Sequence, residues 1–148
     1  MIIVGGSAIE VYTRGEYLSG DIDIVADRDR LPPVLEAWGF RHAGRIWYQT
    51  DCKIADDAVR GYDHYRGSLD RTEVVETPYG TIRIEAVGDA MVRRLISSRY
   101  WHLPKDFEIA VIVAMTHAEE IDWAYAEEIA RFDDVSDLLA ELRRRIKF

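Results

Sequence analysis

The chain has 148 residues, of which 48% are hydrophobic and 31% are charged. This length and composition predict one ordered globular domain with a core, and they exclude an intrinsically disordered protein. Nineteen lysines and arginines against 27 aspartates and glutamates leave a net charge of −8. That acidity excludes a protein that coats nucleic acid non-specifically, although it is compatible with one local basic groove.

Cysteine content and hydropathy bear on the compartment. Cys52 is the only cysteine, so the chain can form neither an internal disulfide nor a paired-cysteine metal or redox site. The longest apolar run, residues 109–115, is far too short to cross a membrane. The first residues lack the charged and apolar regions of a secretory signal peptide. We therefore expect a cytoplasmic protein with no membrane partner.

The sequence predicts strands and helices up to residue 102 and helices alone beyond it, from β-branched runs, alternation and helical periodicity bounded by glycine and proline turns. The expected strands are residues 2–4, 21–25, 45–49, 52–55, 72–77 and 81–87; the last four form two hairpins, with a loop or broken helix over 58–69. The expected helices are residues 8–13, 31–38, 89–100, 106–118, 120–132 and 135–146. This pattern divides the chain into a mixed core, residues 1–102 with net charge −3, and a helical part, residues 103–148 with net charge −5, packed on the same domain.

A Gly5-Gly6-Ser7 turn stands between the first expected strand and the first expected helix, which Ser7 can cap. Glycines let a phosphate approach the backbone, and a helix N-terminus offers unpaired N–H groups with a partial positive charge. The Ser7 hydroxyl adds a further donor. Most such turns are only turns, so this motif alone is a weak indication of phosphate binding.

The second motif is Asp21-Ile22-Asp23, on the next expected strand. Positions i and i+2 of a strand point to the same face, so both carboxylates project together while Ile22 and Ile24 face the core. Two such charges repel each other, and a divalent cation between them removes the repulsion. Mg²⁺ suits the arrangement because it accepts a few carboxylates together with waters and phosphate oxygens. The alternative is a solvent-facing strand with two incidental aspartates.

The order of the two motifs is more specific than either alone, because 13 residues separate Ser7 from Asp21. Residues 4–12 followed by 19–25 resemble the signature of the DNA polymerase β-like nucleotidyltransferase superfamily. The resemblance implies an α/β (α+β) fold with a small mixed β-sheet flanked by helices and a helical C-terminal half. It also implies that Gly5, Gly6 and Ser7 hold a nucleoside triphosphate and that Asp21 and Asp23 bind Mg²⁺ or Mn²⁺. In that family the metals bridge the phosphates and activate an acceptor hydroxyl for attack on the α-phosphorus, with pyrophosphate leaving.

Later residues extend the resemblance to small stand-alone nucleotidyltransferase-like proteins. Arg94-Leu95, Arg99 and Lys105-Asp106 look like the helix pair of that subgroup, and residues 121–125 are similar to its C-terminal helices. The subgroup includes toxins of abortive-infection toxin–antitoxin systems, so the resemblance implies an antitoxin partner. It also makes Arg94 and Arg99 candidate nucleotide-binding residues.

The superfamily places a third carboxylate on a neighbouring strand. Asp56, at the end of an expected strand, is the first choice; Ala55 in that position instead would leave the site incomplete. Glu85 is the second choice, and its alternative role is an exposed strand residue paired with Arg83 or with a cross-strand neighbour. Glu10 is expected to be a solvated helical residue rather than a metal ligand.

The expected helix over 89–100 is rich in basic residues. One interpretation is a phosphate clamp for the triphosphate or for an RNA acceptor; the other is a solvated face that pairs with the acidic C-terminal half, and both stay open. Among the tryptophans, Trp38 and Trp123 are expected to fill cores.

The sequence therefore predicts a Mg²⁺-dependent nucleotidyltransferase that moves a nucleoside monophosphate from a triphosphate to a protein or RNA hydroxyl. Asp21 and Asp23 would bind metal, with Asp56, or alternatively Glu85, completing the site. A second hypothesis is an inactive member of the same fold that binds a nucleotide or a partner. A third is an assembly protein whose acidic helical half binds a partner.

Overall fold

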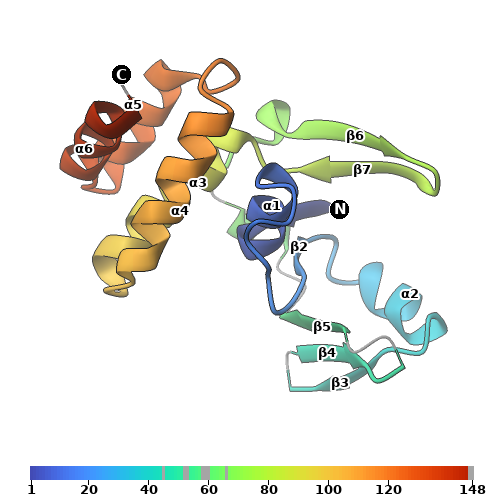
Figure 1. Ribbon diagram of the computed structural model, residues 1–148. Coiled ribbons are helices and arrows are strands. Elements are labelled where there is room, and N and C mark those ends of the chain that lie inside the picture. The colour runs from blue at the N-terminus through green and yellow to red at the C-terminus, as the bar shows by residue number, and fades with distance from the viewer. Residues whose placement is uncertain (45, 52–53, 58–60, 66, 147–148) are drawn as a thin grey trace. The chain divides into compact units, whose positions relative to one another are not determined.

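The computed structural model describes residues 1–44, 46–51, 54–57, 61–65 and 67–146, without the side chains of 54–57 and His64 (Figure 1). The chain forms two compact units. The first comprises Met1–Val11 and Leu18–Ala86, and the second comprises Tyr12–Tyr17 and the chain from Val87 onward. The division therefore falls at Ala86, whereas the sequence analysis placed it after residue 102.

The first unit is built on a four-stranded sheet. Its strands are β1 (Ile2–Val4), β2 (Asp23–Val25), β6 (Glu73–Thr77) and β7 (Gly80–Ile84), in the order β2-β1-β7-β6. Strand β1 pairs antiparallel with β2 and parallel with β7, while β6 and β7 form the expected antiparallel hairpin. The β-branched residues of β1 suit this central position, because β1 is covered by a neighbour on each edge.

Helix α1 (Gly5–Tyr12) follows β1 directly and begins at Gly5, three residues before the expected start. Its inward residues Ala8, Ile9 and Tyr12 are buried, which is the spacing of one helical face. Because β1 is adjacent to both β2 and β7, the turn from β1 into α1 lies at the ends of two neighbouring strands.

The first unit also contains a smaller sheet of order β3-β4-β5. Strand β4 (Ile46–Gln49) pairs antiparallel with β5 (Ile54–Asp57), as the first predicted hairpin requires, and with β3 (Arg41–Ala43), which the sequence analysis missed. The two predicted strands of this hairpin begin at residues 45 and 52. Residue 45 and residues 52–53, which include Cys52, lie outside the described residues.

Helix α2 (Leu31–Ala37) carries its two prolines in the first turn, as predicted. The expectation of a core role for Trp38 is wrong, because Trp38 caps the helix end and is 68% exposed. Between the two hairpins, the described part of residues 58–69 contains one 3₁₀ turn, η1 (Tyr62–His64), and the start of a second, η2 (Leu69–Arg71).

The second unit is helical, as predicted for the C-terminal half. Its helices are α3 (Val87–Tyr100), α4 (Pro104–Thr116), α5 (Trp123–Phe132) and α6 (Ser136–Ile146). Helices α3 and α4 lie side by side, and α6 packs against α4 (Figure 1). Asp122 caps α5 by accepting a hydrogen bond from the backbone N–H of Tyr125. The predicted fold class, a mixed α/β chain with a small mixed sheet and a helical C-terminal half, is confirmed.

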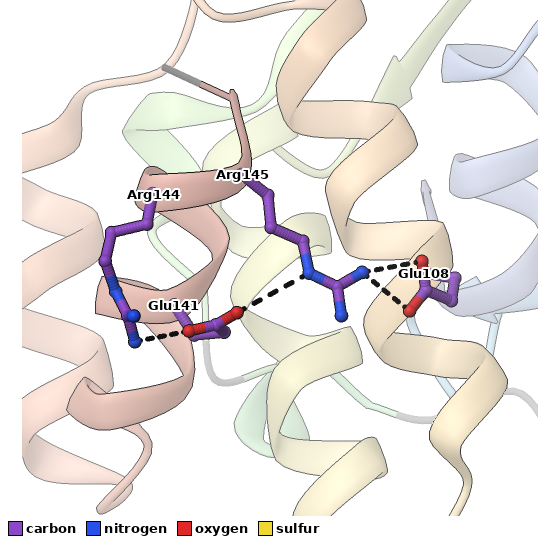
Figure 2. A network of polar contacts seen from close by, with 4 residues as sticks. All are labelled: Glu108, Glu141, Arg144 and Arg145. Atoms are coloured by element: carbon purple, nitrogen blue, oxygen red, sulfur yellow. Dashed lines mark hydrogen bonds and ion pairs between the residues drawn. The ribbon is translucent and has the colours of Figure 1, made fainter. Parts of the chain in front are cut away.

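Charged side chains link α4 to α6 within this unit. Arg145 donates to both carboxylate oxygens of Glu108 at 2.8 and 3.0 Å and lies 3.6 Å from Glu141, which also pairs with Arg144 (Figure 2). The Arg145 guanidinium also stands 4.9 Å from the ring centre of Phe107. The acidic C-terminal half therefore uses part of its charge internally. Within the described residues, no helix has the length and apolar character to cross a membrane.

Candidate functional site

The turn from β1 into α1 is held by two carboxylates from neighbouring strands. The backbone N–H of Gly5 donates to Oε1 of Glu85 at 2.6 Å, and the N–H of Gly6 donates to Oδ2 of Asp23 at 2.9 Å. These amides belong to the first turn of α1, where N–H groups have no partner within the helix and the helix dipole favours negative charge. The carboxylates thus satisfy the donors that the sequence analysis assigned to phosphate.

Gly5 is required at this turn for two reasons. Its φ of +60° lies in the left-handed region, which costs little only for glycine. A Cβ at this position would also stand 2.8 Å from Cγ of Asp23, closer than real Cβ atoms approach other atoms. The glycine therefore serves the approach of a carboxylate of this chain.

Ser7 joins α1 to the backbone around the two aspartates. Its hydroxyl donates to the carbonyl oxygen of Asp21 at 3.0 Å and accepts from the backbone N–H of Asp23 at 3.1 Å. The expected roles of Ser7 as helix cap and phosphate donor compete with these two bonds, because its single hydroxyl proton is already donated.

The two aspartates do not share a regular strand. Strand β2 begins at Asp23, two residues later than predicted, so Asp21 precedes it. The Oδ1 atom of Asp21 lies 3.4 Å from the Ser19 hydroxyl, the long end of hydrogen-bond range. The argument from strand alternation therefore does not apply to Asp21, and the Ser7 bonds, not the strand, tie its backbone to Asp23.

Glu85 is placed quite differently from its expected alternative role. It is fully buried, and its backbone N–H donates to the carbonyl of Ile3 at 2.9 Å, which extends the β1–β7 ladder by one bond. The alternative role of an exposed strand residue is therefore wrong, and Arg83, one of the two partners named for that role, donates to the Thr72 hydroxyl at 2.9 Å. A buried carboxylate is tolerated only when hydrogen-bonded, and the Gly5 amide supplies that bond.

The other candidate for the third carboxylate belongs to the smaller sheet. The backbone of Asp56 lies in β5, opposite Trp47 of β4, and its side chain is outside the described part of the chain. Ala55 lies beside it on the same strand, opposite Tyr48. Over the residues whose side chains are described, no three histidine, cysteine or acidic groups are arranged to hold a metal ion.

Glu10, expected to be a solvated residue of α1, is half-buried and has a specific partner. Its Oε2 atom accepts a hydrogen bond of 2.8 Å from the backbone N–H of Ser19. The sequence carried a weak signal for this contact, because Ser7 and Glu10 are three residues apart and so share a helix face. That signal was missed because the partner of Glu10 is a backbone group in a segment without regular structure.

The two arginine candidates belong to the second unit and pair with acids there. Arg94 lies 3.5 Å from Asp106, with both side chains largely buried, and its guanidinium is 5.4 Å from the ring centre of Tyr17. Arg99 pairs with both carboxylate oxygens of Asp137. That contact lowers the pKa of the Asp137 carboxyl and raises the pKa of the Arg99 guanidinium.

These pairs are the alternative that the sequence analysis gave for the basic helix, and the phosphate clamp stays a prediction. Trp123, the other tryptophan expected in a core, is half-buried and lies under the Arg143 guanidinium at 5.2 Å.

No model of a known protein family matches this chain. No curated protein matches it either. The resemblance to the nucleotidyltransferase signature therefore rests on the sequence motifs in residues 4–25.

Proposed function

We propose that this protein is a Mg²⁺- or Mn²⁺-dependent nucleotidyltransferase that transfers a nucleoside monophosphate from a triphosphate to a hydroxyl of a protein or RNA. One observation carries the proposal. Asp23 begins β2 and Glu85 follows β7, and these two strands flank β1. Both carboxylates accept hydrogen bonds from the Gly5-Gly6 turn. The backbone carbonyl of Asp21 accepts a hydrogen bond from Ser7, which follows that turn. Two carboxylates thus reach one glycine turn, and the backbone of Asp21 is hydrogen-bonded to Ser7 in the same turn of α1.

The donor set fits a hard divalent cation. Carboxylate oxygens are the ligands that Mg²⁺ takes in proteins, and one or two of them suffice when substrate phosphates and waters complete the shell. Asp21 and Asp23 would hold such an ion, so the lack of a three-residue group among the described side chains is compatible with it. When bound, the ion supplies charge neutralisation at the phosphates and activation of the acceptor hydroxyl.

Glu85 is the candidate for the third carboxylate whose side chain the structure describes, and it contacts the glycine turn itself. Its part is to anchor Gly5 and to add negative charge beside the aspartates. In the transfer itself, the acceptor oxygen forms a bond to the α-phosphorus while the bond to pyrophosphate breaks. Positioning and charge neutralisation supply most of the rate in such reactions.

The occupied donors of the turn imply that nucleotide binding depends on the cation. The amides of Gly5 and Gly6 and the hydroxyl proton of Ser7 already have acceptors within the chain. A triphosphate that met these carboxylates without a cation would be repelled. We expect a nucleoside triphosphate to raise the Tm in the presence of Mg²⁺ and to leave it unchanged in the presence of EDTA.

Transfer of labelled nucleotide tests the catalytic assignment. The Asp21→Asn and Asp23→Asn variants are expected to lose label transfer by at least about 10²-fold, because charge stabilisation at the reacting phosphate is the main catalytic contribution. The matched control is Asp70→Asn, the same chemical change at an exposed position of the same unit. Equal labelling by wild type and Asp21→Asn would show that the catalytic assignment is wrong.

The second candidate is a non-catalytic module of the same fold that binds a nucleotide or a partner, such as the antitoxin of a toxin–antitoxin pair. It is favoured by the intramolecular bonds that occupy the Gly5, Gly6 and Ser7 donors. A Mg²⁺-dependent Tm shift without any label transfer, across a panel of four nucleotides and both acceptor classes, would select it.

A further inference from the structure

One face of α1 holds the segment that carries the aspartates. Ser7 and Glu10 are separated by three residues and so lie on the same side of the helix. Ser7 binds the backbone of Asp21 and Asp23, and Glu10 accepts from the backbone N–H of Ser19. These contacts bracket residues 19–23, which we call the 19–23 segment.

We propose that Ser7 and Glu10 are positioning residues that fix the 19–23 segment, so that Asp21 and Asp23 present their carboxylates to one cation, and that Ser7 makes no contact with the nucleotide. This inference rests on the proposed function and deepens it. It differs from the expectation drawn from the motif, in which Ser7 holds phosphate.

The hydrogen-bonding capacity of a hydroxyl supports this assignment for Ser7. A serine has one proton to donate and two lone pairs. The proton goes to the Asp21 carbonyl, and one lone pair accepts from Asp23. What remains is an acceptor, and phosphate oxygens are acceptors as well, so Ser7 has nothing to offer a phosphate in this arrangement.

The 19–23 segment needs such contacts because its own structure is irregular. Asp23 is paired with Val4 of β1, whereas Ser19, Gly20 and Asp21 precede the strand, and a Cβ added at Gly20 would meet nothing within 4 Å. Fixing the backbone of a residue costs conformational entropy, which must be offset before the carboxylates can meet one ion. Three hydrogen bonds from two side chains of a helix provide that compensation.

Hydrogen exchange measures the positioning directly, without metal or nucleotide. Ser7→Ala removes the acceptor of the Asp23 amide, and Glu10→Ala removes the acceptor of the Ser19 amide. Each amide is expected to exchange about fivefold faster in its variant, the effect of losing one hydrogen bond. Ser68→Ala and Glu36→Ala are the controls, because both residues belong to the same unit, Ser68 makes no helix-capping hydrogen bond and Glu36 is exposed. Unchanged exchange at both amides would overturn the proposal.

The affinity for Mn²⁺ alone, followed by electron paramagnetic resonance, tests the link to the cation. We expect the Kd for Mn²⁺ to rise about fivefold in Ser7→Ala and in Glu10→Ala. Glu10→Gln keeps an acceptor oxygen while removing the charge, so its Kd is expected within about twofold of wild type. At saturating Mn²⁺ the Kd for nucleoside triphosphate is expected to be unchanged in Ser7→Ala.

Each result separates this inference from the proposed function. Wild-type binding of Mn²⁺ with no change in Ser7→Ala and Glu10→Ala overturns the positioning role and leaves the function standing. Loss of nucleotide affinity in Ser7→Ala at saturating Mn²⁺ makes Ser7 a phosphate contact and overturns its assignment here. A wild-type chain that binds no Mn²⁺ overturns the function, and the exchange data then still decide whether the segment is held.

Discussion

Gly5 and Glu85 are 80 residues apart in sequence, yet the amide of one donates a 2.6 Å hydrogen bond to the side chain of the other. The contact follows from strand direction. Strands β1 and β7 are parallel, with Ile3 opposite Ile84, so the residues that follow both strands meet at one edge of the sheet. Glu85 therefore closes the turn that begins α1.

Glu85→Ala should be strongly destabilising. The substitution removes a fully buried side chain and leaves the Gly5 amide without its acceptor, two effects that together cost about 3 kcal/mol in unfolding free energy. Urea denaturation of wild type and variant measures this loss. Glu36→Ala, at an exposed position of α2, should change the unfolding free energy by less than about 0.5 kcal/mol. Equal stabilities of the two variants would show that the Gly5 contact is absent in solution.

Glu85→Gln separates the structural role of this residue from its chemical role. Glutamine keeps one oxygen for the Gly5 amide, so the fold should be retained with a loss of at most about 1.5 kcal/mol. If Glu85 contributes to the proposed reaction, label transfer falls at least about tenfold in this folded variant. Full transfer activity in a stable Glu85→Gln protein would show that Glu85 holds the Gly5 turn in place and takes no part in the reaction.

Gly5→Ala should damage the site and destabilise the fold, whereas Gly20→Ala should not. The alanine would adopt a left-handed conformation, which costs roughly 1–2 kcal/mol, and its methyl group would push the Asp23 carboxylate aside. Gly20→Ala is the matched control, because its Cβ meets nothing within 4 Å and its φ is ordinary. Thermal unfolding should show a lower Tm for Gly5→Ala alone; a lower Tm for both would point to general loss of chain flexibility instead.

The sequence was sufficient to predict the helices and hairpins that depend on neighbouring residues. The hairpin of β6 and β7 follows from the turn residues Pro78-Tyr79-Gly80, and the four C-terminal helices follow from apolar periodicity. The glycine turn between β1 and α1 was also predicted correctly, whereas the expected shared strand face of Asp21 and Asp23 is wrong, because Asp21 precedes β2. In the correctly predicted cases the information lies within about ten residues.

The sequence was not sufficient to predict features that depend on contacts between distant residues. In the sequence, Glu85 follows the apolar Ile84, which is the pattern of a strand with one face toward solvent. Only the neighbouring strand β1 makes the Glu85 side chain a buried hydrogen-bond acceptor. Strand β3 has exposed residues and no apolar alternation, so its pairing with β4 leaves no local trace. Trp38 was expected inside because of its type, but the helix ends one residue before it.

The ion pairs between α4 and α6 should contribute to stability in a salt-dependent way. Arg145 bridges Glu108 and Glu141 at the surface (Figure 2), where added salt screens such interactions. A double-mutant cycle with Arg145→Ala and Glu108→Gln should give a favourable coupling at low ionic strength that disappears in 1 M NaCl. Arg145→Ala alone should cost more than Glu108→Gln, because it also removes the contact with the Phe107 ring. A coupling that is independent of salt would contradict this picture.

The Arg99–Asp137 pair provides a pH-dependent test of the basic helix. The hydrogen bond from Arg99 holds the pKa of the Asp137 carboxyl below its ordinary value. The pair therefore stabilises the fold fully above the unfolded-state pKa of about 3.9, and that contribution is lost as the pH falls through the lower folded-state pKa. Arg99→Gln should return the pKa of Asp137 toward its ordinary value in a carbon-detected NMR titration.

The same titration decides between the two interpretations of Arg99. If Arg99 is a phosphate clamp, it must leave Asp137 when the triphosphate binds, because one guanidinium cannot hold both anions in the same bidentate geometry. Saturating Mg²⁺ and triphosphate would then raise the pKa of Asp137 in wild type as far as Arg99→Gln does. An Asp137 pKa that stays low with nucleotide bound would show that Arg99 joins α3 to α6 and takes no part in nucleotide binding.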